Sequence, residues 1–65
     1  MTRFVYRVTL VAADGEADRG VITRTEDVAV FARNQNSAIQ KAAARAAKAA
    51  LRSEVVHSVE FWSAS

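Results

Sequence analysis

Hydrophobic and polar residues alternate near the start of the chain. Phe4, Tyr6, Val8 and Leu10 occupy every second position, with Val, Arg and Thr residues between them. A period of two with aromatic and β-branched side chains is typical of a β-strand. A second run, residues 21–32, is again rich in Val, Ile, Thr and Phe. The pattern therefore predicts two strands of similar length.

A polar segment, residues 14–20, separates these two runs and contains both glycines of the chain. Glycine tolerates positive φ angles and aspartate bonds its own backbone in turns, so the segment predicts a hairpin loop. We favour one long hairpin. The alternative is a bulge or a break near residues 24–27. Asp14, Glu16 and Asp18 alternate as calcium ligands do, but the further ligands of an EF-hand are missing, so a solvated turn is the prediction.

Residues 34–52 have the character of a helix. Alanine, the best helix former, takes eight of the thirteen positions from Ala38 to Ala50. Asn34 is the expected N-cap and Asn36 the competing choice. At 100° per residue one face of this helix is apolar and is expected to be buried. Its members are Ile39, Ala42, Ala43, Ala46 and Ala50.

Residues 55–62 are apolar enough to predict a third strand, which gives the order β-β-α-β in a single domain, residues 1–65. The strand–helix–strand connection makes the second and third strands parallel. The first strand can lie between them and pair antiparallel with both. The prediction is an α+β fold with a three-stranded antiparallel sheet, order 2-1-3, and one helix on one face.

The predicted sheet has two different faces. The helix-facing set is expected to be Phe4, Tyr6, Val8, Leu10, Val28, Val30, Ile39, Leu51, Val59 and Phe61. The opposite face is expected to carry Val5, Val11, Ala29, Phe31, Val56 and Trp62, mixed with Arg3, Arg7, Thr9, Ser58 and Glu60. An uncovered face that keeps large apolar residues usually marks an interaction site. The expected interface residues are Val5, Arg7, Phe31, Val56 and Trp62.

The length of 65 residues makes the core thin. Ordering such a chain costs on the order of 100 kcal/mol, and a small one-layer core usually only offsets that cost. With no cysteine for disulfides, association of copies is the remaining stabilising device. We expect a homo-oligomer, most simply a dimer formed through the open sheet face or an edge strand. A marginally stable monomer is the alternative.

The net charge of +2 says little about partners, but four cations share one side of the predicted helix. Lys41, Arg45, Lys48 and Arg52 recur at i, i+4, i+7 and i+11, and Arg33 precedes them. No acidic residue alternates with them, so ordinary i, i+4 ion pairing is missing. Phosphate contact with a nucleic acid is one interpretation. The others are a solvated helix face and contact with a protein partner.

Catalytic chemistry has little support in the sequence. The only histidine, His57, has no nucleophile motif near it, and no glycine-rich phosphate loop is present. We therefore expect no catalytic residue, no metal and no cofactor. No apolar run approaches the roughly 20 residues of a membrane span, and no charged-then-apolar start suggests a signal peptide. We expect a cytoplasmic protein without a membrane partner.

The segment Ala32-Arg33-Asn34-Gln35-Asn36-Ser37-Ala38-Ile39 places an Asx cap two residues after a strand and opens the buried helix face with Ala-Ile. With its element order, the chain resembles small β-β-α-β accessory proteins of the kind that bacteriophages and mobile elements encode. The resemblance implies a compact binder that dimerises or engages a host macromolecule. The function expected is a small non-enzymatic macromolecule-binding protein that acts as a homo-oligomer. The alternative is a nucleic-acid-binding protein that uses the basic helix face.

Overall fold

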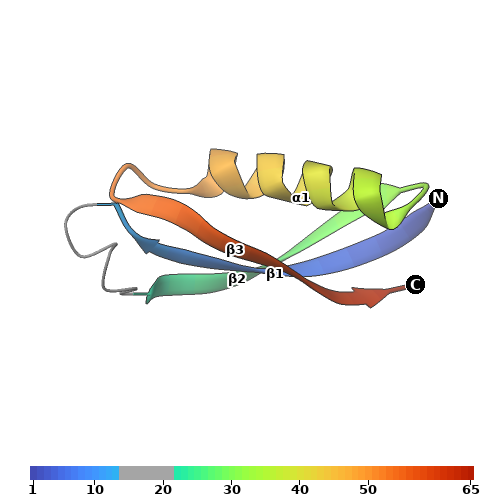
Figure 1. Cartoon of the computed structure of the whole chain (residues 1–65), viewed down its shortest axis with the longest axis horizontal. Coiled ribbons are helices and arrows are strands. Elements are labelled where there is room, and N and C mark those ends of the chain that lie inside the picture. Colours follow the sequence, from blue (N-terminus) through green and yellow to red (C-terminus); the bar gives the residue numbers. More distant parts are fainter. Residues whose placement is uncertain (14–21) are drawn as a thin grey trace.

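The computed structural model describes residues 1–13 and 22–65. Three strands, β1 (Thr2–Ala12), β2 (Ile22–Ala32) and β3 (Glu54–Ala64), form one twisted sheet. The helix α1 (Gln35–Ala49) runs along one face of the sheet and leaves the other face open (Figure 1). The predicted hairpin turn over residues 14–20 lies outside the described residues.

The strand order is β2-β1-β3, and β1 pairs antiparallel with both neighbours. The predicted α+β fold and its 2-1-3 order are therefore confirmed. Residues 22–32 form one continuous strand, so the prediction of one long strand is confirmed against a break near residues 24–27. The register on the β2 side shifts between Leu10 and Val11, which places the irregularity next to Thr23.

Two further register shifts occur between β1 and β3, near His57 and Trp62. Each bulge inserts one residue into β3 and inverts the alternation of its side chains. As a result Val56 and Val59 both pack against the buried core, although they are three residues apart. The sequence prediction that Val56 belongs to the opposite face is wrong, because strict alternation ignores the bulge at His57.

The core lies between α1 and the sheet. Phe4, Tyr6, Val8 and Leu10 are all buried, as their alternation predicts. From β2 and α1 the core adds Val28, Val30, Ala32, Ala38, Ala42 and Ala46. The hydroxyl of Tyr6 donates to the backbone carbonyl of Gln35 at 3.2 Å, so the deepest polar group of β1 has a partner at the start of the helix.

Four residues predicted to be buried are instead exposed, and Ala43 of α1 is one of them. Ile39 is 38% exposed, Phe61 is 48% exposed and Leu51 is 62% exposed. The buried side of α1 is the row Ala38, Ala42, Ala46, so Ile39 is turned to a flank of the helix. Phe61 still touches the core edge-on, since its ring meets that of Tyr6 at a centroid distance of 6.0 Å and an angle of 77°.

The capping residues explain where α1 begins and ends. The side chain of Asn34 accepts a hydrogen bond from the backbone N–H of Ser37 at 2.8 Å, which confirms Asn34 as the N-cap. Ala50 has extended backbone, with φ −65° and ψ 135°, so the helix ends at Ala49. The prediction that the helix reaches residue 52 is wrong, and Arg52 lies in the turn that follows it.

Candidate functional site

The open face of the sheet carries an apolar patch with charged neighbours. Val5 and Ala29 are paired on adjacent strands, and Phe31 lies two residues beyond Ala29 on β2. Trp62 reaches the same face from the bulge in β3. We call these four residues, Val5, Ala29, Phe31 and Trp62, the open-face patch. Phe31 is 58% exposed and Trp62 is 55% exposed, so both large rings are available to a partner.

Arg7 holds the indole of Trp62 in place. Its guanidinium carbon lies 3.9 Å from the ring centroid of Trp62, a cation–π arrangement. The Nε of Arg7 also donates to Asp27 Oδ1 at 3.2 Å, and Asp27 is its partner in the β1–β2 register. The guanidinium of Arg7 therefore links the indole of Trp62 to the carboxylate of Asp27, and an aromatic surface lies beside a charged rim. The structure thus brings together Val5, Arg7, Phe31 and Trp62 of the expected interface, while Val56 lies on the helix side.

Two of the five cations that the sequence singles out bind the backbone of their own sheet. The Nζ of Lys41 donates to the carbonyl of Phe31 at 2.8 Å, and Arg45 Nη1 donates to the carbonyl of Ala29 at 2.6 Å. Both carbonyls belong to β2, which is an edge strand. Edge strands leave backbone groups unpaired and invite association, and charged side chains are a common protection. Lys41 and Arg45 therefore cover the outer edge of β2.

The remaining three cations are spread along the molecule. Lys48 is exposed in the last turn of α1, where a positive charge is favourable near the helix C-terminus. With Lys41, Ala44 and Arg45 it lines a shallow surface hollow. Arg33 and Arg52 are exposed outside the two ends of the helix. The continuous stripe of four cations on one helix face is therefore shortened to three.

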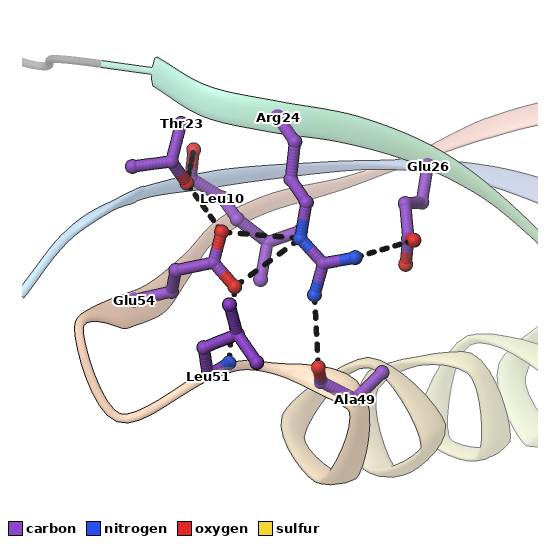
Figure 2. Close-up of polar contacts among 7 residues, drawn as sticks. All are labelled: Leu10, Thr23, Arg24, Glu26, Ala49, Leu51 and Glu54. Carbon is purple, nitrogen blue, oxygen red and sulfur yellow. Dashed lines mark hydrogen bonds and ion pairs between the residues drawn. The ribbon is translucent and has the colours of Figure 1, made fainter.

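Among the described residues, the side chain with the most strongly shifted pKa is that of Glu54. Glu54 is the first residue of β3 and is buried. Figure 2 shows its carboxylate facing donors from β2 and from the segment that follows α1. Arg24 Nε donates to both carboxylate oxygens at 3.1 and 3.2 Å, and the hydroxyl of Thr23 donates at 2.6 Å. The backbone N–H of Leu51 adds a fourth bond at 3.0 Å.

These bonds stabilise the charged form of Glu54. The hydrogen bond from Arg24, followed by those from Thr23 and Leu51, lowers the pKa of the Glu54 carboxyl to about 2. The same hydrogen bond raises the pKa of Arg24. Arg24 also pairs with Glu26 and donates from Nη2 to the carbonyl of Ala49 at 2.8 Å. The cluster thereby ties β2, the C-terminus of α1 and the start of β3 together, and its donors and acceptors are used internally.

Glu54 directly precedes the third strand predicted at residues 55–62, and neither Glu54 nor Arg24 is among the site residues that the sequence predicts. One local signal was available, because Glu54 follows Leu51 by three residues and can reach back to its free N–H, as in a capping box. The contact with Arg24 has no such signal. The two residues are thirty positions apart and meet only across the sheet.

Other expected features of the chain are placed as follows. His57 is exposed on β3. Within residues 1–13 and 22–65, no group of three His, Cys, Asp or Glu side chains is placed to hold a metal ion. Asp14, Glu16 and Asp18 lie outside the described residues. Across the part of the chain that the structure covers, no helix has the length and apolar character required to cross a membrane.

The structure thus offers two kinds of surface, an apolar patch on the open sheet face and sheet edges of different character. The two surfaces meet at Phe31 and Trp62, which lie on the edge strands. Compared with protein-family models, with curated proteins and with solved structures, the chain matches none.

Proposed function

We propose that this chain is a small non-enzymatic protein that acts as a homo-oligomer and binds another protein through the open-face patch. The observation that carries the proposal is the exposure of Phe31 and Trp62 together on a face without a covering layer. Aromatic side chains at the centre of a patch with a polar rim are the usual anchors of protein interfaces. Arg7, Asp27 and Glu60 supply such a rim.

Arg7 supports this proposal in a second way. Because its contacts with Asp27 and Trp62 fix the indole before any partner arrives, little side-chain entropy remains to be lost on binding. The cluster around Glu54, formed with Thr23, Arg24, Glu26 and Leu51, supports the non-enzymatic part of the proposal. Its hydrogen bonds join three elements of the fold, and this is a structural role for the most perturbed carboxylate of the described residues.

Random peptides displayed on phage and selected on the immobilised protein provide the test. Selected peptides should lose affinity by at least about tenfold against Phe31→Ser or Trp62→Ser, since a truncated aromatic anchor commonly costs more than the 1.4 kcal/mol that tenfold represents. Leu51→Ser is the matched control, because Leu51 is 62% exposed and lies off the sheet. Peptides that bind all three variants as well as the original protein would contradict the proposal.

Nucleic-acid binding by the basic helix face is the competing class. Lys41 and Arg45 already bond to the carbonyls of β2, which is an observation against their being free for phosphates. Titration with duplex and single-stranded oligonucleotides at low and moderate salt, followed by Trp62 fluorescence and by anisotropy of labelled oligonucleotide, should give no tight binding. Tight binding that falls steeply with salt and is lost in Lys48→Glu would replace the proposed function.

A further inference from the structure

The two edge strands of the sheet differ in how far side chains cover their backbone groups. At β2, Lys41 and Arg45 reach down from the helix to the outward carbonyls of Phe31 and Ala29. At β3, within the described residues, no side chain forms a hydrogen bond to a backbone group of the strand. Unprotected edges of this kind are templates for pairing with another strand.

The unprotected edge is also long. β3 has eleven residues, which span about 36 Å at roughly 3.3 Å per residue. Its inner side is used by β1, as Arg3 and Ser65 show by exchanging hydrogen bonds of 2.9 and 2.8 Å. In an antiparallel ladder alternate residues turn their N–H and C=O groups to the other side. The outer side of β3 therefore presents backbone donors and acceptors, in a row that the bulges near His57 and Trp62 interrupt.

The helix flanks follow the same asymmetry. Lys41 and Arg45 each precede a buried alanine of α1 by one position, whereas Ile39 and Ala43 each follow one, so the two pairs lie on opposite flanks. Because the cations reach β2, the flank of Ile39 and Ala43 is on the side of β3. Both residues are exposed, and Phe61 adds an exposed ring from β3 itself. The helix side of the open edge is therefore apolar.

We propose that β3 pairs antiparallel with β3 of a second copy, which joins two three-stranded sheets into one of six strands. This rests on the homo-oligomeric part of the proposed function and names its contact. A twofold axis perpendicular to the sheet satisfies the backbone of both edges at once and places both helices on one face. The two open-face patches then lie side by side on the other face and remain free for a partner.

The cover on the C-terminal part of β2 favours an assembly that closes. If both edges were open, β2 of one copy could pair with β3 of the next and a filament would grow. With Lys41 and Arg45 on the carbonyls of Phe31 and Ala29, the C-terminal part of β2 is closed to such pairing, and β3 is the more open edge. A stable interface buries about 800 Å² per partner. That area is less than a fifth of the 4416 Å² that the chain exposes.

Two matched variants test this pairing. Thr9 of β1 pairs with Thr25 on one side and with Ser58 on the other, so these two residues occupy equivalent positions on the two edge strands. Ser58 is next to the middle of β3. In a twofold ladder centred there it comes opposite Ser58 or Glu60 of the second copy, and a glutamate at this position meets another negative charge.

Sedimentation velocity from micromolar to submillimolar protein gives the readout. The original protein and Thr25→Glu should sediment as dimers, with twice the chain mass of 7.1 kDa. Ser58→Glu should weaken the dimer by at least about tenfold, because the charge enters twice across the axis. Far-ultraviolet circular dichroism shows whether each variant is folded. If Ser58→Glu is unfolded, Ser58→Asp replaces it, with Thr25→Asp as its partner on β2.

The outcomes separate this inference from the proposed function. A folded Ser58→Glu chain that dimerises as tightly as Thr25→Glu would overturn the β3 contact while leaving peptide binding by the open-face patch to its own test. A monomer at every concentration in the original protein would overturn both the β3 contact and the homo-oligomeric part of the function. Loss of the dimer in Phe31→Ser or Trp62→Ser, but not in Ser58→Glu, would place the contact on the open faces and also overturn the inference.

Discussion

An Ala42→Leu variant should lose about 1–3 kcal/mol of its free energy of unfolding, because three further carbon atoms have no room between the helix and the sheet. Ala42 has no exposed surface, and its neighbours Ala38 and Ala46 are buried beside it. The methyl groups of these alanines set the distance at which α1 lies on β1 and β2. A leucine at this position has to lift the helix or take an unfavourable rotamer.

The loss is large for a domain of this size. At about 0.05–0.15 kcal/mol per residue, a chain of 65 residues has a total stability of roughly 3–10 kcal/mol. Urea unfolding at a fixed protein concentration measures the change, since association would otherwise alter the apparent stability. Ala44→Leu is the matched control. Ala44 is exposed, and leucine is nearly as good a helix former as alanine, so its effect should be small. Equal effects of the two substitutions would contradict the packing described.

A Glu54→Gln variant should be less stable than the original protein at neutral pH and should lose much of its sensitivity to acid. The folded state holds the pKa of Glu54 at about 2, below the ordinary value of 4.5. A carboxyl whose pKa is lowered by folding stabilises the protein above its unfolded pKa. That stabilisation is lost as the pH falls from about 4.5 toward 2. Glutamine cannot ionise, so the variant lacks this contribution at every pH.

Urea unfolding at several pH values between neutrality and pH 2 distinguishes the two chains. The difference in unfolding free energy should be largest at neutral pH and should shrink through the window from about pH 4.5 to 2. Glu60→Gln is the matched control, because it makes the same chemical change at an exposed position of the same strand. A difference between Glu54→Gln and the original protein that stays constant with pH would show that the carboxylate acts through its shape and not through its charge.

The opposed character of the two edges links stability to association. Lys41 and Arg45 use their charge to cover β2, and the same side chains keep the surface of α1 solvated on that side. On the other side, the exposed Ile39 and Phe61 would be covered only in an assembly. In the proposed pairing through β3, a chain with a thin core gains apolar burial from a second copy.

The secondary structure of this protein can be predicted from local patterns in its sequence. Alternation at Phe4, Tyr6, Val8 and Leu10 predicts β1, and the run of alanines predicts the helix, because strand and helix periods depend only on near neighbours. Asn34 caps the helix through a bond to Ser37, three residues away. The order β2-β1-β3 also follows from the sequence, since the handedness and direction of a strand–helix–strand connection leave few arrangements.

Only the tertiary structure decides how these elements meet. The bulges near His57 and Trp62 change which face each side chain of β3 takes, so Val56 lies on the core side. No local sequence pattern predicts these bulges. Arg24 and Glu54 are distant in the sequence and become a pair because β2 and β3 converge on the end of α1. Lys41 is a surface cation by its helical position, yet the placement of α1 over β2 turns it into a cover for the sheet edge. Side-chain periods are local properties, whereas register and edge contacts depend on strands that are brought together only when the chain folds.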